Sequence, residues 1–225
     1  IPSFTATNPG TVPIDATITV TPVATSFAYV PDASGKISAF NTVTKELVTS
    51  MAVGSDPYGV SVSPDGSRVF GTNRGSNTVS VISSSTHQVS GTIPVDGSPC
   101  GVVVSADGSK VYVANTSSGS ISVIDASTQS VVASIPVTAS LPEGLALNAD
   151  GTRLYVIGGN QMSVISTFSN AEINTVSLGS ILTSLKAVAV SSLTGRIYVV
   201  DGGFGMNSVY VIDPLTHAVA STINP

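Results

Sequence analysis

The sequence repeats itself about every 42 residues, and this periodicity limits the folds open to the chain more than any other feature. The segment from Pro57 to Asn73 reads PYGVSVSPDGSRVFGTN. Related segments begin at Pro99, Pro142 and Leu185, so successive copies are 42, 43 and 43 residues apart. A fifth, more divergent copy comes first, TITVTPVATSFAYVPD from Thr17 to Asp32. Tandem units of this length predict a repeat architecture in which each unit covers the apolar face of its neighbour.

Each unit reads as four short strands, rich in β-branched residues and separated by Gly, Asn, Asp or Ser turns. Asp65-Gly66, Asp107-Gly108 and Asp150-Gly151 mark the turn between the first two strands, because Gly accepts positive φ and Asp bonds to nearby backbone. No segment has sustained helical periodicity. A lone four-stranded unit leaves both faces partly apolar, and a closed ring of units covers them. We therefore predict an all-β fold, a β-propeller of five blades, each of four antiparallel strands, around a central channel.

The repeat also divides the chain. The propeller is expected over residues 14–225, with repeats at 14–56, 57–98, 99–141, 142–184 and 185–225. Residues 1–13 form a separate N-terminal segment. Ser3–Thr7 suits a strand that helps to close the ring, whereas Pro9, Gly10 and Pro13 suit a linker, and both interpretations stay open. The start Ile1-Pro2-Ser3, without Met or signal peptide, indicates a processed or excised product.

Composition excludes several classes of partner. The net charge is −5 and no cluster of Lys or Arg occurs, so nucleic acid is not expected to bind. No apolar run approaches the roughly 20 residues that span a bilayer, so membrane insertion is not expected. Charged residues are only 9%, and Ser and Thr replace them, which is typical of secreted and cell-surface β proteins. We expect a secreted or cell-surface protein with a protein or glycan ligand, monomeric if five blades close the ring and self-associating otherwise.

The repeat resembles a known family. VYVAN at Val111–Asn115, with RLYVIG and RIYVVD at the equivalent places, is similar to the YVTN-type repeat of surface-layer and lactonase-like β-propeller proteins. The pattern PxGVxVSxDG is the other half of that signature. The resemblance covers nearly the whole chain after residue 14. It implies a propeller fold, and it leaves function open because such repeats occur in binding, structural and enzymatic propellers.

The candidate ligand site lies at the mouth of the predicted channel, where first strands start and second strands end. The residues at the first-strand starts are Tyr58, Cys100, Glu143 and Lys186. The polar residues at the second-strand ends are Asp32, Asn73, Asn115 and Asp201, and the residues expected on the rim are Asp56, Arg74 and Phe204. One interpretation is a polar pocket that binds a ligand. The alternative is that these are exposed positions free to vary, with Asn and Asp starting turns.

Two features near this mouth have a functional and a structural interpretation. Glu143 and Lys186 fall at equivalent places in adjacent repeats, so they either pair weakly or hold a zwitterionic ligand. The loop Gly202–Gly205 contains Phe204 and has two interpretations. Either its glycines let the backbone come close to a ligand on which Phe204 stacks, or the loop is a flexible insertion. It lacks the Lys-Ser/Thr and the following helix of a phosphate loop.

Catalytic and metal-binding sets are missing from the sequence. His87 and His217 occupy matching turns between third and fourth strands, two or more blades apart, where Lys45 and Gln129 stand in other repeats. A polar turn role is therefore expected for them, and no metal or cofactor is expected. Cys100 is the single cysteine, and it is expected to pack against the neighbouring strand. No Ser-His-Asp set or Gly-x-Ser-x-Gly elbow is present.

Three hypotheses about function follow. The first is a non-enzymatic binding or interaction module that presents its site on the face formed by first-strand starts and second-to-third-strand loops. The second is a lactonase- or lyase-like enzyme at the channel mouth, in which Glu143, Asp56 or Asp201 acts as base or metal ligand and Lys186 stabilises an anion. The third is a purely structural surface repeat.

Overall fold

The computed structural model describes residues 26–224 except 33, 180–183 and 204–205. Within these residues the chain forms nineteen strands in five antiparallel sheets. None of the described residues is helical. The all-β prediction is therefore confirmed. The N-terminal segment 1–13 and residues 14–25 of the first repeat lie outside the described residues.

Each sheet is built from consecutive strands of one repeat, and the strand order in every sheet follows the chain. Sheet 1 contains β1 (Phe27–Asp32), β2 (Lys36–Asn41) and β3 (Leu47–Ala52). Sheet 2 contains β4 (Pro57–Val62), β5 (Arg68–Asn73), β6 (Thr78–Ser83) and β7 (Gln88–Pro94). Sheet 3 contains β8 (Pro99–Val104), β9 (Lys110–Asn115), β10 (Ser120–Asp125) and β11 (Ser130–Pro136). Sheet 4 contains β12 (Gly144–Leu147), β13 (Arg153–Gly158), β14 (Gln161–Ser166) and β15 (Ala171–Ser177), and sheet 5 contains β16 (Leu185–Val190), β17 (Ile197–Gly203), β18 (Met206–Ile212) and β19 (Val219–Ile223).

The turn between the first two strands of sheets 2, 3 and 4 has the expected Asp-Gly geometry. Gly66, Gly108 and Gly151 all have a φ of +71°, a conformation that glycine adopts without a steric penalty. The preceding aspartate fixes the turn, since in sheet 2 Asp65 Oδ1 accepts hydrogen bonds from the Ser63 hydroxyl at 2.6 Å and the Ser67 amide at 3.0 Å. These bonds lower the pKa of Asp65 to about 2.

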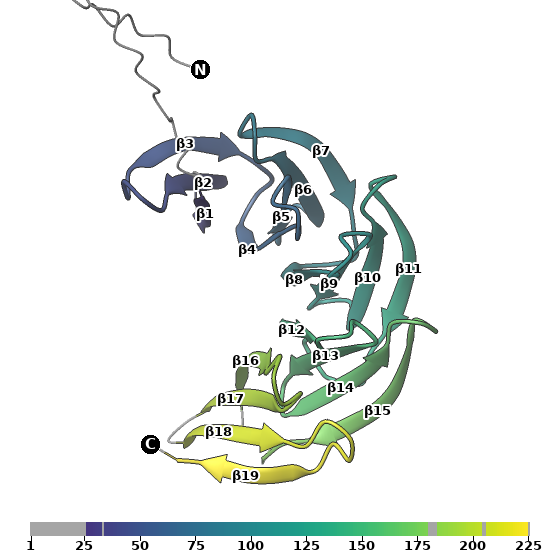
Figure 1. Ribbon diagram of the computed structural model, residues 1–225. Helices are drawn as coiled ribbons and strands as arrows, with labels where there is room; N and C mark the ends of the chain where they lie inside the picture. Colours follow the sequence, from purple (N-terminus) through teal and green to yellow (C-terminus); the bar gives the residue numbers. More distant parts are fainter. Residues whose placement is uncertain (1–25, 33, 180–183, 204–205, 225) are drawn as a thin grey trace, which may run out of the picture.

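The five sheets stand side by side along an open arc (Figure 1). The first strands β4, β8, β12 and β16 line the concave side, and β3, β7, β11, β15 and β19 form the outer side. An opening separates sheet 1 from sheet 5, so the described residues do not form the closed five-bladed ring that the repeat count predicted. The packing between sheets sets the angle from one sheet to the next, and the four steps between the five sheets leave the circle incomplete.

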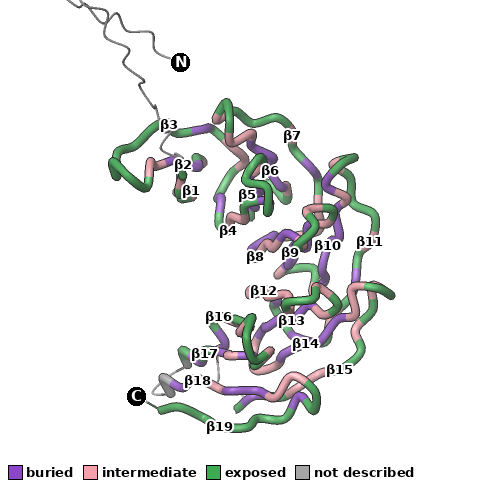
Figure 2. The backbone as a smooth tube through the Cα atoms, in the orientation of Figure 1, coloured by how far each residue is buried: buried purple, intermediate pink, exposed green. Residues whose placement is uncertain are grey.

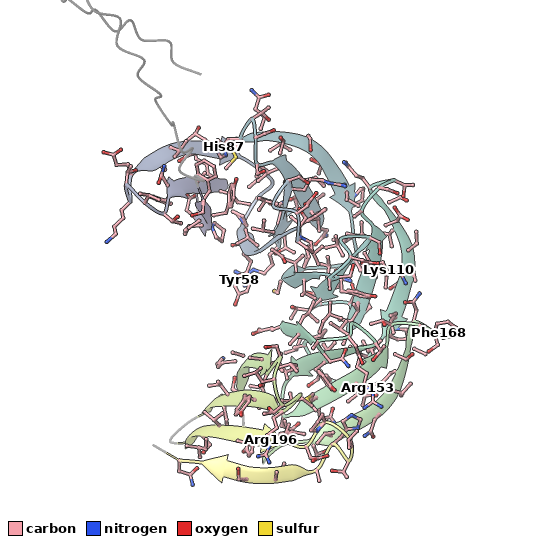
Figure 3. All side chains as sticks on the ribbon, in the orientation of Figure 1. Tyr58, His87, Lys110, Arg153, Phe168 and Arg196 are labelled. Carbon is pink, nitrogen blue, oxygen red and sulfur yellow. The ribbon has the colours of Figure 1, made fainter. Side chains whose placement is uncertain are left out.

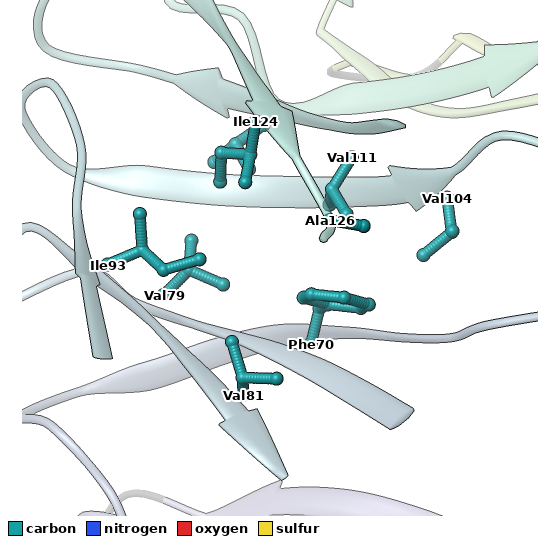
Figure 4. Packing of buried hydrophobic residues seen from close by; sticks show 9 residues of the cluster. Phe70, Val79, Val81, Ile93, Val104, Val111, Ile124 and Ala126 are labelled. Atoms are coloured by element: carbon teal, nitrogen blue, oxygen red, sulfur yellow. The ribbon is translucent and has the colours of Figure 1, made fainter. Parts of the chain in front are cut away.

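The apolar core lies between neighbouring sheets, and not within one of them. Phe70 and Val81 of sheet 2 pack against Val111 and Ile124 of sheet 3 (Figure 4). Comparable clusters join sheet 1 to 2, sheet 3 to 4 and sheet 4 to 5. Buried positions accordingly follow the middle strands, while the outer strands are largely exposed (Figure 2). A middle strand is apolar on both faces because both faces are covered.

Candidate functional site

The candidate site is built on the first strands, which approach one another closely on the concave side. A Cβ at Gly59 would stand 2.4 Å from the carbonyl oxygen of Cys100 in sheet 3. A Cβ at Gly101 would likewise stand 2.1 Å from the carbonyl oxygen of Glu143 in sheet 4. Only glycine fits at these two positions, because any side chain would overlap backbone of the next sheet. The glycine of the Pro-x-Gly pattern therefore brings Tyr58, Cys100 and Glu143 into adjacent positions, as the repeat predicted.

Thr72 fixes the junction between sheets 2 and 3. Its hydroxyl donates to the carbonyl oxygen of Cys100 at 2.7 Å and accepts from the Gly59 amide at 2.9 Å. The Thr72 side chain is fully buried. The Thr116 hydroxyl makes the corresponding link from sheet 3 to sheet 4, donating to the carbonyl oxygen of Pro142 at 2.8 Å.

The residue before the proline of each first strand has left-handed backbone in three sheets. The φ angles of Asp56, Ser98 and Leu141 are +52°, +55° and +52°. Residues other than glycine adopt this backbone region at an energetic cost, which is lower for Asp than for most residues. The amide of Arg74 donates to the Asp56 carbonyl at 2.9 Å, and the strained turn is held by the loop that follows the second strand. Such strain is concentrated at functional sites in many proteins.

Asp56, Tyr58 and Arg74 form a side-chain group that we call the Arg74 cluster. Arg74 Nε donates to Asp56 Oδ2 at 2.7 Å, and the Arg74 guanidinium lies 4.9 Å from the centroid of the Tyr58 ring. The Arg74 and Asp56 side chains are 42% and 46% exposed, and Tyr58 is 47% exposed. Tyr58 lies on the concave side of the arc (Figure 3).

The Arg74 cluster presents a paired guanidinium beside an aromatic ring. The pKa of Arg74 is raised chiefly by its hydrogen bond to Asp56, with a smaller effect in the same direction from the Cys100 side chain of sheet 3. An exposed ion pair contributes only about 0–1 kcal/mol to stability, so the fold depends little on it. A guanidinium stacked on an aromatic ring offers its remaining N–H groups to a carboxylate or phosphate in a fixed plane.

Glu143 and Lys186 do not pair with each other. Among the described residues, Arg74 and Asp56 form the single ion pair within 4.0 Å. Glu143 is half-buried, and its amide donates to the carbonyl of Ile157 at 2.9 Å. Lys186 is exposed, and its aliphatic stem lies over Gly202, where a Cβ would be 2.7 Å from Lys186 Cγ.

The polar residues at the second-strand ends mostly make hydrogen bonds within their own sheet. Asn73 Nδ2 donates to the hydroxyls of Thr78 and Ser80, both at 3.0 Å, and the Asn73 side chain is fully buried. Asn115 is likewise fully buried, and its Nδ2 donates to Ser120 at 3.2 Å and to Ser122 at 2.9 Å. The amides of both residues point back into the turn, so these two predicted site residues present no surface to a ligand.

The remaining predicted residues are also accounted for. Asp201 is 1% exposed, and its Oδ1 accepts from the Ser184 amide at 3.2 Å. Asp32 accepts from the amide and hydroxyl of Ser34 at 2.7 and 2.5 Å, which lowers the pKa of Asp32 and fits the turn-starting alternative. Cys100 is 2% exposed and packs at the junction of the sheets, as expected. Phe204 lies outside the described residues.

Both histidines lie in the expected turn, where each has a positive φ. In addition, their rings pack on the preceding sheet. His87 meets the Phe27 ring edge-on at 4.6 Å between centroids, and His217 meets the Tyr155 ring edge-on at 6.3 Å. His217 is 9% exposed, because the turn folds its ring into the junction between sheets 4 and 5. The Thr-His pairs at matching places were the sequence signal for these contacts.

Cavities occur between neighbouring sheets at the strand ends opposite the Arg74 cluster, and the sequence analysis did not foresee them. The cavity between sheets 3 and 4 has a volume of about 270 Å³ and is lined by residues that include Asp107, Lys110 and Tyr112. Asp107 accepts from the Ser105 hydroxyl at 2.6 Å and the Ser109 amide at 3.1 Å, and these bonds lower its pKa to about 2. Its carboxylate therefore stabilises the turn.

The described residues contain no group of three or more His, Cys, Asp or Glu side chains placed to hold a metal ion. In the same part of the chain, no helix is long and apolar enough to cross a membrane.

Comparison with known proteins shows what the chain is similar to. The family model described as "Lactonase, 7-bladed beta-propeller" matches residues 24–134. Together with the five repeated antiparallel sheets, this match decides the architecture. The fold is a β-propeller. No curated protein matches the chain.

The structural likeness extends over most of this propeller. Hydrazine synthase of Kuenenia stuttgartiensis is similar with a TM-score of 0.80 and 22% identity, over 85% of this chain and 60% of that one. A functionally unknown protein from Desulfotomaculum acetoxidans DSM 771 is similar with a TM-score of 0.71 and 16% identity, over 86% of this chain and 65% of that one. The chain thus spans less than two thirds of either structure, and at these identities the likeness concerns the fold alone.

Proposed function

We propose that the propeller is a non-enzymatic binding module, secreted or on the cell surface, whose site is the Arg74 cluster on the concave side. The ligand is a protein segment or glycan that presents an anionic group beside an apolar or ring surface. The Arg74 guanidinium, held by Asp56 and stacked on Tyr58, carries this proposal.

The geometry supports recognition of such a ligand in two ways. Asp56 orients the guanidinium through Nε, which leaves the terminal N–H groups as donors for an anion. The half-exposed Tyr58 ring supplies a flat surface on which a sugar or an apolar side chain can stack. A chain with only 9% charged residues and abundant Ser and Thr fits export.

A panel of acidic and neutral glycans and peptides, read by surface plasmon resonance, tests the proposal. We expect binding of acidic members, lost in Arg74→Gln and in Tyr58→Ala, and weakened by salt. Phe168→Ala is the matched control, because Phe168 is 97% exposed on another part of the molecule. Retention of binding in Arg74→Gln would overturn the assignment, and so would equal loss in the control.

Lactone hydrolysis is the second candidate, and the family match over residues 24–134 favours it. Asp56 and Glu143 would then act as acid–base groups or metal ligands and Lys186 would stabilise an anion, whereas Asp201 is too deeply buried to reach a substrate. Turnover of a lactone that stops with a chelator and in Glu143→Gln would replace the binding proposal. If the protein neither binds a member of the panel nor hydrolyses a lactone, the purely structural role remains.

A further inference from the structure

The cavity between sheets 3 and 4 has counterparts at the same end of the neighbouring junctions. A cavity of about 220 Å³ lies between sheets 2 and 3, and one of about 370 Å³ lies between sheets 4 and 5. The residue that starts the second strand of the earlier sheet lines each cavity, and in chain order these residues are Arg68, Lys110 and Arg153 (Figure 3). Lysine in place of arginine distinguishes the cavity of about 270 Å³ between sheets 3 and 4 from the other two.

Both arginines are bound to backbone of the next sheet. Arg68 Nη1 donates to the carbonyl oxygen of Ala126, the residue directly after the third strand of sheet 3. Arg153 Nη1 donates to the equivalent carbonyl oxygen in sheet 5, that of Pro214, at 3.1 Å. By contrast, within the described part of the chain Lys110 Nζ donates no hydrogen bond. Its ammonium lacks the planar fork with which a guanidinium spans the junction, and it remains available to a ligand.

Two hydroxyl groups from different sheets meet at the same cavity. Thr167 takes the place in sheet 4 that Ala126 has in sheet 3, and its hydroxyl donates to the carbonyl oxygen of Gly151 at 2.7 Å. The lone pairs of this hydroxyl remain as acceptors. Tyr112 lines the cavity and is 2% exposed. Burial, and next the charge of Asp107, raise the pKa of Tyr112, while the neighbouring Thr167 hydroxyl acts in the opposite direction, so the phenol keeps its proton as a donor.

Two carboxylates also line the cavity, one from each sheet. Asp107 accepts from the Ser105 hydroxyl and from the amide and hydroxyl of Ser109. Asp150 accepts from the Thr152 hydroxyl at 2.6 Å and from the Thr152 amide at 2.9 Å, both at Oδ1. These bonds lower the pKa of both carboxyl groups, so both are charged at neutral pH. Because a carboxylate has about four lone-pair sites, each can still accept from a hydroxyl of a ligand.

The mixture of charges around the cavity disfavours an ion as its ligand. A small anion would meet the ammonium of Lys110 but also two carboxylates, and a cation would meet the carboxylates but also the ammonium. A neutral molecule with several hydroxyls matches both signs, because each hydroxyl group can donate to a carboxylate and accept from an ammonium. At roughly 30 Å³ per water molecule of the liquid, the cavity has the space of about nine waters, which is the scale of one sugar ring and below that of most drug-sized ligands.

We propose that the cavity between sheets 3 and 4 is a binding site for one neutral sugar ring. The ammonium of Lys110 and the phenol of Tyr112 donate to oxygens of the sugar, and Asp107 and Asp150 accept from its hydroxyls. The neighbouring junctions lack this site because their guanidinium groups are already bound to backbone. The site lies at the strand ends opposite the Arg74 cluster and does not depend on the proposed function.

Titration calorimetry with the methyl pyranosides of glucose, galactose and mannose tests the proposal. We expect a dissociation constant on the order of millimolar for at least one of them, because a single ring offers few atoms for contact. Lys110→Met and Asp150→Asn are each expected to weaken this binding roughly tenfold, since each removes a charged hydrogen-bonding partner. Lys36→Met is the matched control, because it removes the same charge from an exposed position in sheet 1.

Lys110→Arg separates binding from stability. This variant keeps the charge, but its guanidinium is expected to donate to the Thr167 carbonyl as Arg68 donates to that of Ala126. We therefore expect sugar binding to be lost while the urea midpoint does not fall. Unchanged sugar binding in Lys110→Arg would overturn the proposal, and so would the absence of binding of all three pyranosides to the wild type. Loss of binding in Arg74→Gln with retention in Lys110→Met would assign the sugar to the Arg74 cluster and likewise overturn the choice of cavity.

Discussion

Arg153 and His217 are joined across the junction of sheets 4 and 5 by a contact of 3.1 Å between Arg153 Nη1 and His217 Nε2. Arginine can only donate, so Nε2 accepts in this contact, and the hydrogen of the neutral ring is on Nδ1. The side-chain amide of Asn174 contacts Nδ1 at 2.9 Å on the other side of the ring. The imidazole therefore lies between two polar partners from sheet 4, although it belongs to a turn of sheet 5.

The contact predicts a dependence of stability on pH near neutrality. Burial, and next the Arg153 charge, lower the pKa of His217 below its ordinary 6.5. The folded state thus disfavours protonation of His217. Its contribution to the free energy of unfolding is therefore complete above pH 6.5 and is lost as the pH falls through the folded-state pKa. Urea midpoints at pH 8 and pH 5 are expected to differ less in His217→Asn than in the wild type. Equal differences in the two proteins would contradict the prediction.

Alanine at Gly59 or Gly101 is expected to destabilise the propeller. The new Cβ would lie 2.4 Å or 2.1 Å from a backbone carbonyl oxygen of the next sheet, and neither strand can move without disturbing its own sheet. Overpacking of this kind costs about 1–3 kcal/mol, and urea unfolding measures it. Gly91→Ala is the matched control. Its Cβ would meet only the end of the Gln129 side chain, which can turn away, so a similar loss there would argue against the backbone explanation.

Thr72→Val is expected to cost roughly 1–3 kcal/mol, although its shape hardly changes. The substitution removes the hydroxyl, which accepts from the half-buried Gly59 amide and donates to the Cys100 carbonyl, so both groups lose this partner. Thr72→Ser keeps the hydroxyl and serves as the comparison in the same denaturation experiment. A serine variant as unstable as the valine variant would mean that packing of the methyl group, and not hydrogen bonding, matters at this position.

Asp107 is expected to contribute to resistance against acid. Its pKa is lowered to about 2, chiefly by the Ser105 hydroxyl and then by the Ser109 amide. Because the folded pKa lies below the ordinary value of 3.8, the contribution of Asp107 to the free energy of unfolding is present above pH 3.8 and is lost as the pH falls toward 2. Asp107→Asn should therefore narrow the difference between the unfolding temperatures at pH 5 and pH 2.5. The side chain is exposed, so the effect is expected to be small.

Local chemistry made much of the fold predictable from the sequence. The aromatic register from Tyr29 to Tyr198 and the Asp-Gly turns depend on interactions within one repeat, and both occur as expected. The adjacency of Tyr58, Cys100 and Glu143 was predictable for the same reason, since equivalent positions in stacked units are neighbours.

The site residues were less predictable because burial of a polar side chain depends on its surroundings. Asn73 and Asn115 stand at strand ends, where sequence alone suits a solvent-exposed turn. In the structure their amides fold back onto hydroxyls of the next strand and are fully buried. Arg74 and Tyr58 are 16 positions apart in the chain, and their contact likewise depends on the path of the loop that follows β5.

By itself, the sequence determined the strands, their turns and their grouping into repeats, since these follow from a periodicity of apolar and turn-forming residues within about 42 positions. Only the tertiary structure decided how far five repeats travel around the circle, which polar side chains remain exposed and which apolar face stays open. These properties depend on the angle at which one sheet packs on the next, and that angle comes from side chains of two repeats acting together.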